Sequence, residues 1–121
     1  MFDRLQKMLG PVRVDYADLR YELVRETSID FDGRELTGLS ASSTDGYVLR
    51  VLKNGGWSSV AFTRPEDAER AARSAVENAE LLARGGARPV RLAPSPPVQD
   101  EYHPALKEDP RQVSTEAKFD L

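Results

Sequence analysis

The sequence predicts an α+β domain, in which a four-stranded antiparallel meander packs against one long alanine-rich helix. A short helix precedes the sheet and an extended proline-rich arm follows the long helix. Three observations support this fold class. Residues 17–31 alternate between apolar and polar side chains, which is the period of a strand with one face on a core. Residues 63–86 repeat alanine at helical spacing. Residues 87–111 contain six prolines, as extended segments often do.

The first elements are a short helix and a long strand. Residues 2–9 place their apolar side chains near one helical face, and Gly10-Pro11 ends the helix. The strand over 17–31 follows. Asp32-Gly33 is a dipeptide that favours tight hairpins, and it predicts a second strand over about 34–43.

Two further turns complete the predicted meander. Asp45-Gly46 predicts a turn before a third strand over 47–52. That strand is apolar on both faces except at Arg50, which predicts a central position in the sheet. Asn54-Gly55-Gly56 predicts the last turn, and the fourth strand then spans 57–63.

The long helix has sequence signals at both ends. Thr63-Arg64-Pro65-Glu66 fits a capping box, with threonine as the cap and glutamate three residues later. Gly85-Gly86 ends the helix. Because the apolar stripe is mostly alanine, the helix axis is expected to lie close to the sheet. The stripe comprises Ala68, Ala71, Ala72, Ala75, Val76, Ala79 and Leu82.

The organisation along the chain is an α+β domain over residues 1–86 and an arm over 87–121. The arm ends in the start of a helix capped by Ser114, about two turns before Leu121. We interpret this as a cut through a longer protein, with a catalytic domain missing after it. The alternative is a tail that frays naturally.

Composition narrows the classes of function. The chain has 40% hydrophobic and 31% charged residues, a net charge of −3 and no cysteine. No thiol nucleophile, disulfide or cysteine-ligated zinc is possible, and a cytoplasmic location is expected. Basic and acidic residues are interspersed along the chain, so nucleic acid is not expected as a partner. No apolar run is long enough to cross a membrane, so no membrane partner is expected either.

No catalytic, cofactor-binding or metal-binding residue is assigned. His103 is the only histidine, whereas a hydrolytic zinc site needs two or three, so His103 is interpreted as a surface residue. An EF-hand-like frame starting at Ser28 fails at its first and twelfth positions, Ser28 and Leu39.

Nucleophile and phosphate motifs fail in a similar way. Gly38-Leu39-Ser40-Ala41-Ser42 is one residue short of a nucleophile elbow and lies in a predicted strand. Gly55-Gly56 and Gly85-Gly86 lack the spacing of phosphate-binding loops. Trp57, which begins a strand, is expected to pack in the core or at its rim.

Several strings, taken in order, resemble the N-terminal domain of the TldD/PmbA metallopeptidase family, also called modulators of DNA gyrase. The arm is more similar to the TldD type. The matching strings are Asp18–Glu22, Asp32–Leu36, Gly46–Val51, Gly55–Trp57, Ala61–Thr63, the helix after Pro65, Pro97–Tyr102, Lys107–Pro110 and Ser114–Lys118.

The resemblance implies a part of a zinc metallopeptidase that acts on unfolded peptides. In that family the zinc is held by an HExxxH motif beyond this region, so this chain contributes no ligand. The resemblance also implies a homo- or heterodimer with a TldD/PmbA-type subunit. The expected role is a scaffold, substrate-guiding or subunit-contact domain. The alternative is a stand-alone, non-catalytic module that binds a peptide or protein at a sheet edge. An independent hydrolase has almost no residue support.

Overall fold

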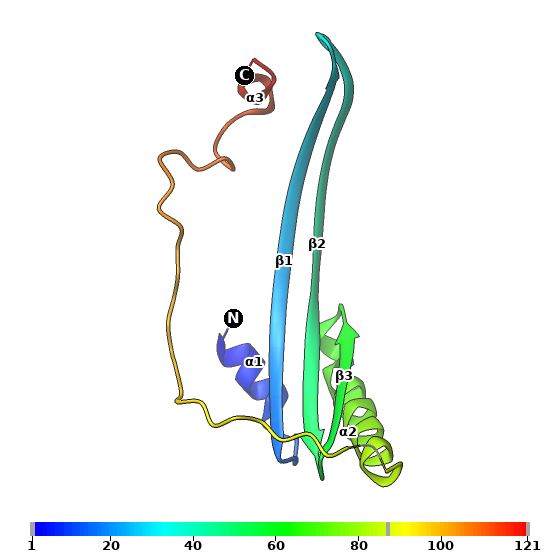
Figure 1. Ribbon diagram of the computed structural model, residues 1–121. Coiled ribbons are helices and arrows are strands. Elements are labelled where there is room, and N and C mark those ends of the chain that lie inside the picture. The colour runs from blue at the N-terminus through cyan, green and yellow to red at the C-terminus, as the bar shows by residue number, and fades with distance from the viewer. Residues whose placement is uncertain (1, 87, 121) are drawn as a thin grey trace. The chain divides into compact units, whose positions relative to one another are not determined.

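The computed structural model describes residues 2–86 and 88–120. The chain forms α1 (Phe2–Leu9), β1 (Tyr16–Asp32), β2 (Glu35–Lys53), β3 (Gly56–Phe62), a 3-10 turn η1 (Pro65–Asp67), α2 (Ala68–Arg84) and α3 (Thr115–Phe119) (Figure 1). Its contacts group into two units. One runs up to Glu26 and includes Ala41–Leu92, and the other joins Thr27–Ser40 to the chain from Ala93 onward.

The sheet has three strands in the order β1-β2-β3, so the predicted four-stranded meander is wrong, while the α+β class is confirmed. The predicted second and third strands are one strand, β2. Asp45-Gly46 forms no turn, because both residues lie within β2 and Gly46 does not have a positive φ. The Asp45 carboxylate accepts a hydrogen bond of 3.0 Å from the Tyr21 hydroxyl. This contact between neighbouring strands stabilises the extended backbone that the dipeptide alone does not favour.

The other two predicted turns are present. The first is shifted by one residue, because Asp32 still belongs to β1 and the turn consists of Gly33, with φ 61°, and Arg34. Asn54 and Gly55 have φ 52° and 85°, as a two-residue hairpin turn with both central residues left-handed requires. β2 and β3 pair antiparallel from Lys53↔Gly56 to Tyr47↔Phe62, so Gly56 belongs to the strand rather than to the turn.

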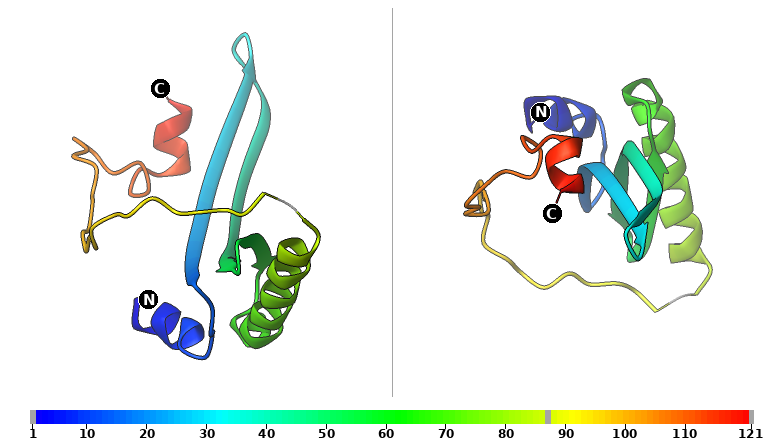
Figure 2. Two further views of the ribbon diagram at one scale, coloured as in Figure 1. Left: turned by 60° about the horizontal axis from the view of Figure 1, so that its bottom comes forward. Right: turned by 90° about the horizontal axis from the view of Figure 1, so that it is seen from above.

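The core lies between the sheet and α2, which Figure 2 shows running alongside the strands. Leu49 and Val51 of β2 pack with Ala75 and Ala79 of α2. The helix approaches closely, because a Cβ on Gly56 would overlap the backbone of Ala79. Residues that pack around this cluster are Leu9, Val14, Ala17, Leu19, Val60, Phe62, Ala72 and Val76.

The predicted alanine stripe is confirmed at Ala71, Ala75 and Ala79, which are buried, but Leu82 is 47% exposed. The predicted capping box is wrong. Helical turns begin as η1 at Pro65, and no side chain caps the start of η1 or of α2. The carboxylate of Asp67 instead accepts from Arg64 at 3.2 Å and from Arg70 at 2.9 Å.

Residues 88–106 form neither helix nor strand, and the extended proline-rich arm stays a prediction. The Val90 amide donates to the Gly55 carbonyl at 2.9 Å. Ser114 caps α3, as predicted, and its hydroxyl accepts from the Ala117 amide at 3.1 Å. The division at residues 86 and 87 into a domain and an arm stays a prediction. None of the helices in the described ranges is long and apolar enough to cross a membrane.

Candidate functional site

The most distinctive feature of the sheet is a step in its width. β3 pairs with β2 only as far as Tyr47↔Phe62, and the chain then leaves the sheet for η1. β2 extends beyond this point with β1 as its one strand partner in the described chain (Figure 1). Residues 41–46 of β2 therefore present one open edge, whose backbone N–H and C=O groups are free to pair with another strand.

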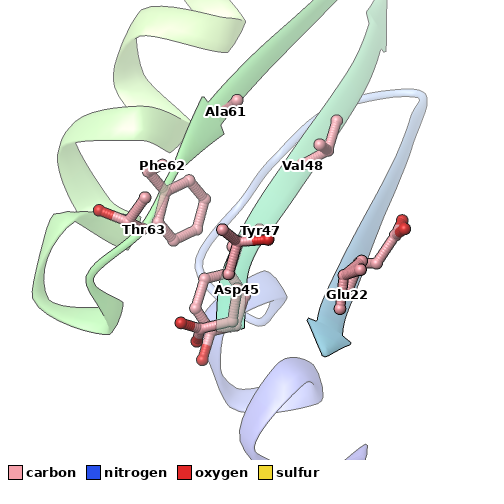
Figure 3. A pocket seen from close by; sticks show the side chains of 10 residues that line it. Glu22, Asp45, Tyr47, Val48, Ala61, Phe62 and Thr63 are labelled. Atoms are coloured by element: carbon pink, nitrogen blue, oxygen red, sulfur yellow. The ribbon is translucent and has the colours of Figure 1, made fainter. Parts of the chain in front are cut away.

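A hollow of about 410 Å³ lies at this step (Figure 3). It is lined by Glu22 and Val24 of β1, residues 44–48 of β2, and residues 61–63 at the end of β3. Successive side chains of a strand point to opposite faces. The lining includes both members of such pairs, Tyr47 beside Val48 and Phe62 beside Ala61, so the hollow extends around the edge of the sheet.

Aromatic packing supports the floor of this hollow. The rings of Tyr47 and Phe62 are stacked, with centroids 5.0 Å apart and an interplanar angle of 10°. Tyr21 packs against Tyr47 with centroids 4.8 Å apart. Tyr47 is 3% exposed, so its ring is held in place from two sides. The floor therefore consists of large aromatic side chains in fixed positions, and binding pockets are commonly lined by side chains of this kind.

The charged groups of the hollow are both carboxylates. Glu22 forms an ion pair of 2.9 Å with Arg20. Asp45 accepts from the Tyr21 hydroxyl instead. This hydrogen bond is the main reason why the pKa of Tyr21 is raised above its ordinary value, since a tyrosinate could not donate to the carboxylate. The hydrogen-bond partner of Asp45 is thus a neutral phenol, and among the described residues no lysine or arginine lines the hollow.

The open edge contains neither lysine nor proline, two residue types that commonly protect edge strands. Residues 41–46 read Ala-Ser-Ser-Thr-Asp-Gly, with no lysine and no proline. Residues 41–45 are exposed. Natural sheets commonly block such edges with lysine, proline, a bulge or a covering loop. An edge without lysine or proline beside an apolar hollow can add a further strand.

Comparison with known proteins identifies the family. The family model described as PmbA/TldA metallopeptidase domain 1 matches residues 17–79, more than half of the chain. The chain belongs to the TldD/PmbA metallopeptidase family. The match runs from β1 to α2 and includes every residue that lines the hollow. No curated protein and no solved structure matched the chain.

The zinc that the TldD/PmbA family implies does not fit the residues of this domain. Within residues 2–86 and 88–120, no three His, Asp or Glu side chains gather as a metal ion would need. His103 is 80% exposed, and its Nε2 lies 2.9 Å from Glu101 Oε1. The interpretation of His103 as a surface residue agrees with this position.

Other candidates are explained by local structure. The Ser28 hydroxyl donates to the Asp30 carboxylate at 3.2 Å, a contact between near neighbours in one strand. Trp57 packs against Tyr16 with centroids 6.2 Å apart, and the Arg50 guanidinium lies 5.4 Å from its ring centre. The prediction that Trp57 has a packing role is therefore confirmed.

The sequence did not reveal the hollow or the open edge. The sequence predicted a strand that ends at about residue 43 and a turn at Asp45-Gly46, whereas residues 42–46 lie within β2. The open edge depends on where β3 stops relative to β2, which is a property of pairing between strands. The one available signal was the absence of lysine and proline from residues 35–46.

Proposed function

We propose that this domain guides substrate for a TldD/PmbA-type zinc metallopeptidase. In this proposal an extended, unfolded peptide adds as a strand to the open edge of β2. Hydrolysis and its zinc belong to a part of the enzyme outside these residues. The proposal includes the cytoplasmic location and the pairing with a TldD/PmbA-type subunit that the sequence led us to expect.

The observation that carries the proposal is the end of β3 at Phe62, while β2 continues with an open backbone edge at an apolar hollow. Main-chain hydrogen bonds to such an edge are independent of sequence, and the adjacent hollow receives side chains. A peptidase that acts on unfolded chains needs binding of this kind, because its substrates share an extended backbone rather than one side-chain pattern.

The test uses peptides with modified backbones, so that no variant of the domain has to fold. In an antiparallel pair, alternate residues of a strand bond to the partner, and those between them point away. We compare a labelled extended peptide with two versions, each N-methylated on one alternate set of residues. Binding to the full chain is measured by fluorescence anisotropy. One methylated set is expected to abolish binding, and the other to preserve it. Equal binding by both versions would contradict strand addition.

A metal analysis tests the separation of guidance from hydrolysis. The full chain, purified and dialysed, is expected to contain far less than one zinc per chain and to leave unfolded peptides intact. Elemental analysis and mass spectrometry of the peptides measure the two quantities. Stoichiometric zinc together with cleavage would show that the domain itself is the hydrolase.

The same edge also favours the second candidate, a stand-alone module that binds peptides or proteins without serving an enzyme. It predicts the same loss of binding on N-methylation. The two candidates differ in the full-length parent. If the parent cleaves unfolded peptides, then peptides that bind this edge should be cleaved faster than their N-methylated versions, and a module with no link to catalysis would give equal rates.

A further inference from the structure

We infer that the open edge selects peptides that carry a basic side chain, arginine above all, opposite Asp45. The inference rests on the proposed function and names the chemistry of its ligand. Three features of the unit that includes Ala41–Leu92 support the inference. They are the register of β3, the position of Asp45 next to the aromatic floor, and the sign of the charges around the hollow.

The pairing register of β2 and β3 indicates which residue of the bound peptide would lie opposite Asp45. β3 ends with Tyr47↔Phe62 in antiparallel pairing, so a peptide that continues the line of β3 meets Gly46 first and Asp45 next. Directly opposite residues of an antiparallel pair have Cβ atoms about 4.5–5.5 Å apart. The peptide side chain opposite Asp45 is therefore within reach of its carboxylate.

The face of the sheet determines the surroundings of that side chain. Asp45 has the same parity in β2 as Tyr47, so both side chains lie on the face that α2 covers farther along the strand. A guanidinium group opposite Asp45 would lie beside the stacked rings of Tyr47 and Phe62. Arginine bonds to carboxylates through two parallel N–H groups and also stacks on aromatic faces, which lysine does less well.

The charge around the hollow favours a cation. Among the residues that the structure describes, Asp45 and Glu22 are the charged ones that line it, and Glu22 is already paired with Arg20. Arg25 of β1 lies near enough to Tyr21 to influence its titration, but in the described chain it forms no ion pair with Asp45. The carboxylate of Asp45 therefore remains available to a basic group of the ligand.

Charge also favours a peptide over a second copy of the chain. Two copies that paired through this edge would each bring an Asp45 and a net charge of −3. Like charges placed together across an interface are unfavourable. A basic peptide segment meets no such repulsion.

The experiment measures a ratio of affinities. Three labelled peptides differ only at the central residue, which is Arg, Gln or Glu. Each is titrated with the full chain by fluorescence anisotropy at low salt. The Arg peptide is expected to bind about two- to five-fold more tightly than the Gln peptide, as for an exposed ion pair, and the Glu peptide more weakly than both. The ratio of Arg to Gln should fall at about 0.15 M salt, where exposed charges are screened.

Variants assign the ratio to one carboxylate. In Asp45→Asn the ratio of Arg to Gln is expected to fall to about one, because the amide still accepts from Tyr21 but carries no charge. Glu77→Gln removes the same charge from an exposed position on α2 outside the hollow, and it should keep the ratio of the unmodified chain.

The outcomes separate the inference from the proposed function. Equal binding of the three peptides, or a ratio that Asp45→Asn leaves unchanged, overturns the inference while strand addition stands. Failure of every peptide to bind overturns the proposed function itself. If sedimentation shows instead that the edge pairs two copies, and peptides do not compete with this pairing, the occupant is a second copy and the inference is wrong.

Discussion

The two parts of β2 belong to one strand but have different surroundings. From Tyr47 to Lys53 the strand lies between β1 and β3, and Leu49 and Val51 are 3% and 0% exposed. Within Ala41–Gly46 its one strand partner in the described chain is β1, and none of these side chains is buried. Burial of apolar surface is the dominant favourable term in folding, so the paired part carries most of the stability. The open part contributes little and leaves its backbone available to a ligand.

The largest effect should come from the point where α2 approaches β3 most closely. Gly56→Ala would place a Cβ against the carbonyl of Ala79 and 2.9 Å from the Ala83 amide nitrogen, both in helix backbone. Because helix backbone cannot yield as a flexible side chain can, we expect a loss of about 3 kcal/mol or more in the free energy of unfolding. Urea denaturation followed by circular dichroism measures it.

Gly10→Ala is the matched control for this change. Its added Cβ would lie 3.6 Å from the Lys7 carbonyl oxygen, an ordinary van der Waals distance. The free energy of unfolding should then change by less than about 1 kcal/mol. Equal stabilities for the two variants would mean that α2 does not approach the sheet as closely as the structure has it.

Two valines of β2, three residues apart, test the difference between the two faces of the paired part. Val51→Ala removes methyl groups from a fully buried position and should cost about 2 kcal/mol. Val48 is 38% exposed at the hollow, and Val48→Ala should cost less than about 1 kcal/mol. Thermal unfolding of the two variants side by side gives the comparison. A larger loss of stability for Val48→Ala than for Val51→Ala would contradict the assignment of the core to the face that carries Val51.

Much of the fold followed from local sequence patterns. The alternation over 17–31 predicted β1, and the alanine repeat predicted the buried face of α2, since both periods are set by backbone geometry within one element. Asp32-Gly33 and Asn54-Gly55 predicted the hairpins, because glycine and asparagine readily adopt the left-handed conformations found at Gly33, Asn54 and Gly55.

The errors came from interactions between elements. Asp45-Gly46 has the composition of a turn, but the hydrogen bond from Tyr21, 24 residues earlier, belongs to the pairing of two strands. The candidate site was missed for the same reason, because the open edge exists only where β3 ends against β2. No periodicity within β2 records the length of its neighbour.

The smallest effect concerns an ion pair that joins the paired end of β2 to α2. Lys53 Nζ lies 2.7 Å from Glu80 Oε1, and the two side chains are 28% and 29% exposed. The hydrogen bond and charge of Lys53 lower the pKa of Glu80 below its ordinary value of 4.5, and Arg84 adds a smaller effect in the same direction. The folded state therefore favours the charged carboxylate. The resulting stability is present above pH 4.5 and is lost as the pH falls through the lower pKa of the folded state.

Lys53→Gln should raise the pKa of Glu80 at least to its ordinary value of 4.5, because the burial that remains raises this pKa more than Arg84 lowers it. A carbon-13 NMR titration of the Glu80 carboxyl group measures the pKa directly. The melting temperature of the variant should fall below that of the unmodified chain at neutral pH, and the two should converge in acid, where Glu80 is protonated in both. Arg84→Gln is the control with the smaller shift, since Arg84 is 75% exposed and lies 3.3 Å away. A greater rise in pKa for Arg84→Gln than for Lys53→Gln would show that the contact along α2, and not the link from β2 to the helix, holds this carboxylate charged.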